Sequence, residues 1–87
     1  MALAELFAQA QLEVKELTQR PANEELLDLY ALFKQATEGD NETDQPGMFD
    51  IKEQFKWKQW NTKKGMSADE AMQAYVDLVA SLKAKYS

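Results

Sequence analysis

Hydrophobic residues recur every three or four positions in four stretches of the sequence, which is the spacing of helices with one apolar face. The stretches lie close to residues 3–18, 24–38, 51–64 and 68–86. No stretch alternates apolar and polar residues for long enough to predict a strand. The pattern therefore predicts an all-α protein, a four-helix bundle with helices of about three to five turns each.

Proline and glycine residues mark the ends of these helices. Pro21 closes the first stretch, because the residue before a proline avoids the helical conformation. Asn23 is expected to cap the second helix, with two glutamates in its positive first turn. Gly39 and Gly65 are expected to end the second and third helices, since glycine readily adopts the left-handed conformation found there.

Residues 39–50 have no apolar period and contain two of the three glycines, so they predict one long loop. Asp50 is expected to cap the third helix, with Glu53 completing a box-like pattern. Ser67 and Glu70 are spaced as a capping box at the start of the fourth helix. These signals complete the outline of four helices joined by short turns and one long loop.

The composition excludes much chemistry. A chain of 87 residues is expected to form one domain over residues 1–87, and 45% hydrophobic residues are typical of a globular protein. It contains no cysteine and no histidine, which excludes disulfides, thiol redox chemistry, His- or Cys-based zinc sites and Cys or His catalysis. We therefore expect a protein that is not an enzyme and has no metal site and no cofactor.

The chain also lacks signals for membranes or export. No apolar run approaches the ~18 to 20 residues of a membrane span, and the first residues do not resemble a signal peptide. We therefore expect a cytoplasmic protein without stable membrane insertion. The absence of cysteine fits a reducing compartment.

Charge is unevenly distributed along the sequence. The net charge is −5, but residues 1–44 carry 3 cations and 10 acids, for −7, whereas residues 45–87 carry 7 cations and 5 acids, for +2. The third helical stretch has five lysines and one glutamate. Because the body as a whole is acidic and would repel phosphate at long range, nucleic acid is not an expected partner.

The lysines of the third stretch suggest a site for an anion with a flat ring. Lys52, Lys56 and Lys63 lie within about 40° on a helical wheel, flanked by Phe55 and Trp60. Ammonium groups beside aromatic faces suit a ligand that carries phosphates and a base. Alternatively, the aromatic residues Phe55, Trp57 and Trp60 form core and the lysines are solvated.

The second stretch favours the ligand-binding interpretation. Tyr30, Phe33 and Lys34 are spaced at i, i+3 and i+4, so two aromatic rings and one ammonium share a patch. Lys15 adds a cation to an otherwise acidic first helix. A ligand with several anionic groups would then be held from several sides.

The segment Tyr30-Ala-Leu-Phe33-Lys34-Gln35-Ala36-Thr37-Glu38-Gly39-Asp40 is similar to the signature Tyr-x-x-Tyr-Lys-Gln-Ala-Thr-x-Gly-Asp of the acyl-CoA-binding protein family. The resemblance continues through Pro46-Gly47-Met48-Phe49-Asp50, Lys56-Trp57-Lys58-Gln59-Trp60-Asn61, Gly65-Met66-Ser67 and Ala71-Met72-x-Ala74-Tyr75. It covers essentially the whole chain.

The resemblance implies an up-down-down-up bundle, shaped like a shallow bowl, that binds long-chain acyl-CoA without changing it. It implies an intracellular acyl-CoA carrier and pool former in lipid metabolism, monomeric, with transient contacts to enzymes or membranes. The ligand-binding residues it implies are Lys15, Tyr30, Phe33, Lys34, Lys52, Lys56 and Tyr75. The resemblance implies that Lys34 and Lys56 bind phosphate and that Lys52 lies near the head group. Tyr75 also lies on the apolar face of the fourth helix, so it is either a ligand contact or a residue that belongs partly to the core.

Two features depart from the family pattern. Phe33 stands where the family usually has tyrosine, which keeps a ring face for adenine but loses a phenol hydrogen bond. Gln11 and Leu12 stand where the family tends to small or charged residues. A competing hypothesis is a helical interaction module that docks on a protein or a membrane surface through its aromatic-basic third helix.

Overall fold

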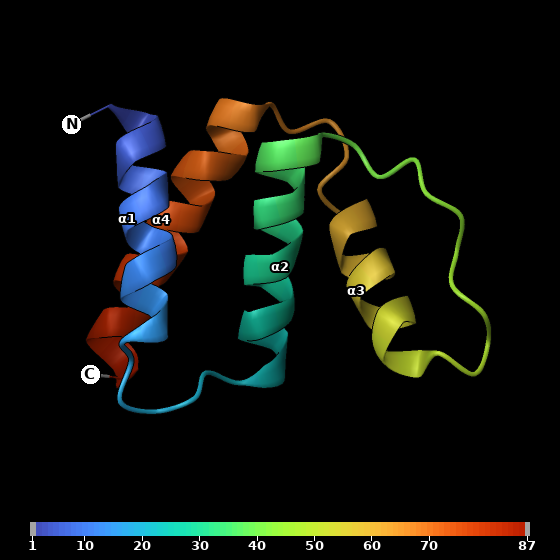
Figure 1. The fold of residues 1–87 in the computed structure, drawn as a ribbon, viewed down its shortest axis with the longest axis horizontal. Coiled ribbons are helices and arrows are strands. Elements are labelled where there is room, and N and C mark those ends of the chain that lie inside the picture. The colour runs from blue at the N-terminus through green and yellow to red at the C-terminus, as the bar shows by residue number, and fades with distance from the viewer. Residues whose placement is uncertain (1, 87) are drawn as a thin grey trace.

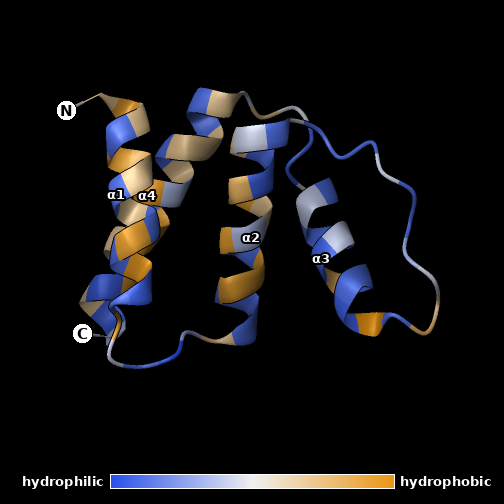
Figure 2. Cartoon of the chain, in the orientation of Figure 1, coloured by the Kyte–Doolittle hydropathy of each residue, from blue (hydrophilic) through white to orange (hydrophobic). Residues whose placement is uncertain are grey.

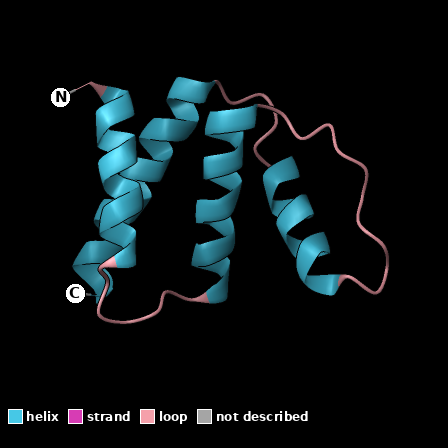
Figure 3. Ribbon diagram, in the orientation of Figure 1, coloured by secondary structure: helices cyan, strands magenta, loops and turns pink. Residues whose placement is uncertain are grey.

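A computed structural model describes residues 2–86 as four helices joined by loops, with no strand among these residues (Figures 1 and 3). The helices are α1 (Leu3–Lys15), α2 (Asn23–Glu38), α3 (Ile51–Asn61) and α4 (Ala68–Tyr86). The predicted all-α four-helix architecture is confirmed.

The helices follow the up-down-down-up order. In Figure 1, α1 and α4 run in one direction and α2 and α3 in the other. α4 packs against both α1 and α2, whereas α3 packs on α2 alone among the helices described. Because α2 and α3 are parallel, residues 39–50 must return along the length of the bundle before α3 begins, and they form the long outer loop at the edge of Figure 1.

The hydrophobic core lies where α1, α2 and α4 meet. Each helix contributes one apolar face to it, and the largest fully buried side chains include Leu82 and Val79 of α4. The core cluster consists of Phe7, Ala10, Leu29, Leu32, Ala36, Ala71, Tyr75, Val79 and Leu82. α3 contributes no residue to this cluster and is mostly hydrophilic, apart from its first turn (Figure 2).

The capping predictions had mixed outcomes. The box at the start of α4 is confirmed, since Ser67 Oγ accepts from the Glu70 N–H at 3.1 Å and Glu70 accepts from the Ser67 N–H at 3.0 Å. Asn23 is not the cap of α2, because its Oδ1 accepts from Arg20 at 3.0 Å. The carboxylate of Glu25 binds the N–H at the Ala22 N-cap position instead, at 2.8 Å.

The predicted cap of α3 is also wrong. Asp50 occupies the N-cap position, but its side chain makes no capping hydrogen bond, and its ψ of 68° lies outside the extended conformation typical of caps. Glu53 instead pairs with Lys56 at 3.4 Å. The first turn of α3 is therefore held partly from the loop side, by Gln54 Nε2 donating to the Gly47 carbonyl at 2.7 Å.

Two helices are shorter than their apolar patterns predict. α1 ends at Lys15, so Leu17 packs against the core from beyond the helix. α3 ends at Asn61, and residues 62–65 form turns that close at Gly65, with φ of +93°. Gly39, with φ of +82°, ends α2 as expected.

The end of α4 is fastened to the start of α2. Tyr86 donates to Glu25 at 2.5 Å, and Lys85 Nζ pairs with the same carboxylate at 3.2 Å. The phenol hydrogen bond, together with the Ala22 N–H and Lys85, lowers the pKa of Glu25. Thr18 donates to the Tyr86 carbonyl at 2.8 Å, so the α1–α2 connection joins the same contact.

A second fastening lies at the opposite end of α2, around the buried Gln35. Its amide donates to Asp40 at 2.8 Å and to the Met66 carbonyl at 2.9 Å. Asp40 also accepts from the Gly65 N–H at 2.9 Å, and these hydrogen bonds lower the pKa of Asp40. Gln35 and Asp40 thus join the start of the long loop to the α3–α4 connection, and these two segments flank α3 in the sequence.

Candidate functional site

A groove of about 750 Å³ runs between α2 and α3. Its apolar lining comes from both helices, and a single tyrosine, Tyr30, stands at the end nearer the middle of α2. The lining residues are Arg20, Asn23, Leu26, Leu27, Tyr30, Ile51, Lys52, Phe55 and Lys56. The parallel arrangement of α2 and α3 creates this groove, because it places the first turns of both helices at the same end.

A smaller hollow of about 220 Å³ continues from Tyr30, which lines both spaces. It is more polar than the groove, with one lysine, Lys34, and three carboxylates among its lining residues. These residues are Tyr30, Lys34, Glu38, Thr43, Asp44, Pro46, Glu53, Trp57 and Trp60. An apolar groove and a polar hollow therefore meet at one aromatic ring.

Two lysines at this meeting point lie over aromatic faces. Lys56 Nζ is 4.7 Å from the centre of the Tyr30 ring, and Lys34 Nζ is 5.0 Å from that of Trp60. Lys34 also pairs with Glu38, one turn further along α2. The rings attract the ammonium groups through their negative faces and hold them near the boundary between the two spaces.

The two tryptophans of α3 hold the long loop. Trp60 Nε1 donates to the Gly39 carbonyl at 2.9 Å, and Trp57 Nε1 donates to the Thr43 carbonyl at 3.0 Å. Buried Asn41 returns a hydrogen bond to the Trp57 carbonyl at 3.2 Å. Both indoles therefore position the backbone that surrounds Lys34.

The alternative that all three aromatic residues of α3 are core is only partly right. Trp60 is buried, Trp57 is half-buried, and Phe55 is 57% exposed. Phe55 lies in the groove lining rather than in the core. The predicted stripe of three lysines is also incomplete, because Lys63 lies beyond the end of α3 and pairs with Asp28 at 2.7 Å.

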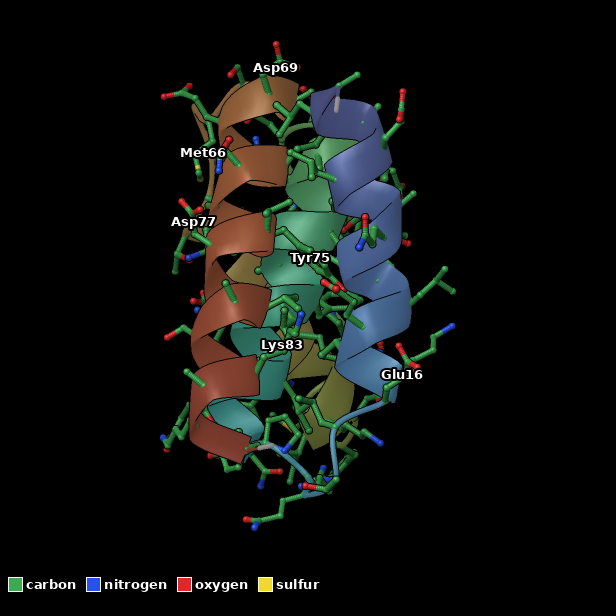
Figure 4. All side chains as sticks on the ribbon, turned by 90° about the vertical axis from the view of Figure 1, so that its left-hand side faces the viewer. Glu16, Met66, Asp69, Tyr75, Asp77 and Lys83 are labelled. Carbon is green, nitrogen blue, oxygen red and sulfur yellow. The ribbon has the colours of Figure 1, made fainter. Side chains whose placement is uncertain are left out.

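Phe33 and Tyr75 lie away from both hollows and are linked through Phe7. The Phe33 ring lies 6.1 Å from that of Phe7 and remains 36% exposed. The Tyr75 ring packs edge-on against the Phe7 ring, with 5.0 Å between the ring centres, and Tyr75 is 6% exposed. Burial raises the pKa of the Tyr75 phenol. Figure 4 shows Tyr75 in the seam between α4 and α1, whereas Asp77 points outward.

The remaining predicted site residues occupy different places. Lys52 is exposed in the first turn of α3 and lines the larger groove, one turn before Lys56. Lys15 is exposed in the last turn of α1 and lines neither hollow. The α2–α3 site thus brings together Tyr30, Lys34, Lys52 and Lys56, while Lys15, Phe33 and Tyr75 are on the α1 and α4 side.

Sequence reasoning missed several residues of the groove. Arg20, Leu26, Leu27 and Ile51 line it, yet none was singled out from the sequence. One signal was present for Ile51, which is an apolar first-turn residue in an otherwise hydrophilic helix and is 62% exposed. Arg20 gave no such signal, because only the folded connection before α2 brings it to the groove.

Within residues 2–86, no helix is long and apolar enough to cross a membrane. No cluster of three or more His, Cys, Asp or Glu side chains there is arranged to hold a metal ion.

Together, the four-helix fold and the paired hollows define a small helical protein with an elongated amphipathic groove. Residues 4–79 match the family model described as Acyl CoA binding protein. The chain belongs to the acyl-CoA-binding protein family.

Relatives and solved structures agree over nearly the full length. The chain is 58% identical over 80 residues to Acyl-CoA-binding protein homolog 1 of Caenorhabditis elegans, covering 92% of this chain and 93% of that protein. It is 49% identical over 85 residues to the Acyl-CoA-binding protein homolog of Drosophila melanogaster, covering 98% and 99%. The crystal structure of Oryza sativa Acyl-CoA-Binding Protein 2 is similar, with a TM-score of 0.92, 38% identity and coverage of 97% and 93%.

Proposed function

We propose that residues 1–87 form a single domain that binds one long-chain acyl-CoA and releases it chemically unchanged. The observation that carries this proposal is the junction at Tyr30, where an apolar groove meets a polar hollow with lysines on either side. A ligand with a long apolar tail and an anionic head matches that division. The names of the relatives support the same class of ligand.

The head group is assigned to the middle of α2. Lys34 and Lys56 lie close enough to the junction to bind phosphate oxygens, each through charge-assisted contacts of roughly 1.5 to 3 kcal/mol. The exposed face of Phe33 offers a stacking surface for adenine, worth roughly 1 to 3 kcal/mol. Lys15, in the last turn of α1, is a further cation that the family resemblance assigns to the ligand, and it lines neither hollow.

The acyl tail is assigned to the larger groove, against Leu26, Leu27, Ile51 and Phe55. Apolar burial contributes about 0.8 kcal/mol per methylene, so two extra carbons strengthen binding roughly fifteenfold. Lys52 lines this groove one turn nearer the start of α3 than Lys56, and we assign it to the tail rather than to the phosphates.

Tyr75 is assigned a positioning role. It is buried and packs edge-on against Phe7, whose ring in turn lies beside Phe33. Tyr75 therefore supports the proposed adenine platform from within the core. Burial raises the pKa of its phenol further above the ordinary value, at which a phenol is already protonated at neutral pH.

The proposed role is that of a monomeric cytoplasmic carrier and pool former for acyl-CoA, with transient contacts to the enzymes or membranes that supply and receive it. A carrier needs no catalytic group or cofactor. The sequence contains no histidine and no cysteine, two residues that enzymes commonly use as general base or nucleophile.

Isothermal titration calorimetry with palmitoyl-CoA, free palmitate and coenzyme A tests this function. Palmitoyl-CoA should bind far more tightly than either part alone, because only the whole ligand engages both hollows. Equal binding of palmitate and palmitoyl-CoA would contradict a site for CoA esters.

A further inference from the structure

Three cations line the α2–α3 groove, and no carboxylate does so in the described part of the chain. They are Arg20, Lys52 and Lys56. This is unusual for a protein with a net charge of −5. The smaller hollow shows the opposite balance, with Lys34 among three carboxylates. A methyl-ended acyl tail accounts for the leucines of the groove, but not for cations along it.

Two of these cations lie at the end of the groove far from the head group. Arg20 precedes α2, and its guanidinium is held by Asn23, the first residue of that helix, at 3.0 Å. Lys52 is in the first turn of α3. Parallel packing places these two starting turns at the same end of the bundle (Figure 1). Tyr30 lies seven residues after Asn23, about 10 Å further along the helix axis.

Ion pairing distinguishes Arg20 and Lys52 from the lysines near the proposed head-group position. Lys34 is paired with Glu38 and Lys56 with Glu53. Within residues 2–86, no carboxylate forms an ion pair with Arg20 or Lys52. The bond to Asn23 uses one guanidinium N–H of Arg20, and a guanidinium has five, so donors remain for an anion.

We infer that Arg20 and Lys52 form a second anion subsite at the tail end of the groove, which selects acyl-CoA esters whose chain ends in a carboxylate. This inference rests on the proposed function, because it requires the tail to lie in the groove. The ligand class is the mono-CoA esters of long-chain dicarboxylic acids. The terminal carboxylate would accept hydrogen bonds from the Arg20 fork and from Lys52 while the methylenes contact Leu26, Leu27 and Phe55.

The alternative is that Arg20 and Lys52 only cover the tail with their aliphatic stems and keep their charges in water. The two arrangements differ in their response to the end of the chain. Aliphatic cover favours an uncharged end, whereas an anion subsite favours a carboxylate. Matched ligands that differ only at that end therefore decide between them.

The experiment is calorimetric titration of the intact protein with three CoA esters: hexadecanoyl-CoA, ω-carboxyhexadecanoyl-CoA and the methyl ester of the latter. The carboxylate ligand should bind about five- to tenfold more tightly than its methyl ester at low salt, the range expected for a partly exposed charge-assisted contact. The preference should shrink at high salt, because added ions screen it. It should be absent for butanedioyl-CoA against its methyl ester, because that carboxylate is too short to reach Arg20.

Variants locate the effect. Arg20→Gln and Lys52→Gln should each reduce the ratio of affinities for the carboxylate ligand and its methyl ester. This ratio is measured within each variant, so it reports on the end of the chain whatever the variant does to the affinity for hexadecanoyl-CoA. Lys58→Gln is the matched control, because it removes the same charge. Lys58 is exposed on α3, as Lys52 is, but does not line the groove. Thermal unfolding of each variant shows that the fold is retained.

Equal affinity of the carboxylate ligand and its methyl ester would overturn the subsite while leaving the proposed function intact. The same applies if Lys58→Gln lowers the preference as much as Arg20→Gln does, because the effect would then be a general one of net charge. Failure of hexadecanoyl-CoA itself to bind would overturn the proposed function, and the subsite with it.

Discussion

The two sides of α2 face different environments. One side packs with α1 and α4 around side chains such as Leu32 and Leu82, which are at most 4% exposed. The other side faces α3, where Ile51 and Phe55 are more than half exposed and line a groove. Apolar residues on the first side stabilise the fold, whereas those on the second leave a surface that the chain itself does not cover.

The two sides are also held together differently. α1 and α4 meet α2 through hydrophobic packing. α3 is held to α2 by the buried Trp60 and by polar contacts, including Gln59 to Asp28 at 3.1 Å and Lys63 to Asp28 at 2.7 Å. Ion pairs near the surface usually contribute little, about 0 to 1 kcal/mol. The comparison indicates that stability and ligand binding depend on separate sets of residues, with α2 shared between them.

The largest expected effect comes from the core side. Leu82→Ala should lower the free energy of unfolding by about 2 to 5 kcal/mol, because it leaves a cavity in a fully buried cluster. Phe55→Ala is the control from the groove side and should cost less than about 1 kcal/mol, since the ring is 57% exposed. Urea unfolding measures both. Similar losses in the two variants would contradict the separation.

Lys34→Ala should give the next largest effect, this time on binding. We expect palmitoyl-CoA affinity to fall by about 1 to 3 kcal/mol with little change in melting temperature. Trp57→Ala should mainly destabilise the fold, because the indole holds the long loop at Thr43. Calorimetry and thermal unfolding separate the two outcomes. Comparable losses of stability would make Lys34 a structural residue instead.

Glu38→Gln should strengthen binding. Glu38 pairs with Lys34 and lines the smaller hollow. Its carboxylate therefore competes with the phosphates of the proposed ligand for the Lys34 ammonium group. Removing that charge should improve palmitoyl-CoA affinity up to about fivefold at low salt, the range for an exposed ion pair. Glu42→Gln removes the same charge from an exposed loop position outside both hollows. An equal gain there would mean that only net charge matters.

The smallest expected effect is a pH dependence that belongs to the core side. The pKa values of Glu25, Asp40 and Glu70 are lowered in the folded protein, chiefly by the Tyr86 phenol, the Gly65 N–H and the Ser67 N–H respectively. Their contribution is therefore complete above the unfolded pKa values and is lost as the pH falls through the lower pKa values of the folded protein.

Tyr86→Phe tests this pH dependence, because it removes the largest cause of the Glu25 shift. The variant should lose less melting temperature than the parent between neutral pH and pH 3. Parallel melting-temperature curves would show that the phenol contact does not couple to stability. Ligand affinity at neutral pH should be unchanged, since Glu25 and Tyr86 do not line the groove.

The elements most fully predicted from sequence are those whose signals are local. The Ser67–Glu70 box and the glycine at the end of α2 depend on neighbouring residues only, and both are confirmed. The Asn23 cap was wrong because a nearby arginine takes its side chain. The groove required knowledge that two segments about thirty residues apart, around Arg20 and Lys52, lie side by side. No local pattern carries that information.

The absence of α3 from the core cluster has a consequence for motion. Among the described helices, α3 alone contributes no side chain to that cluster, so it can detach from α2 without disrupting the core, and α3 with the long loop forms the unit of the protein that opens at lowest free energy. Their amide protons should then exchange with solvent sooner than those of α1 and α4. A ligand that lies between α2 and α3 would slow this exchange, because it would add contacts to a helix that the core does not hold.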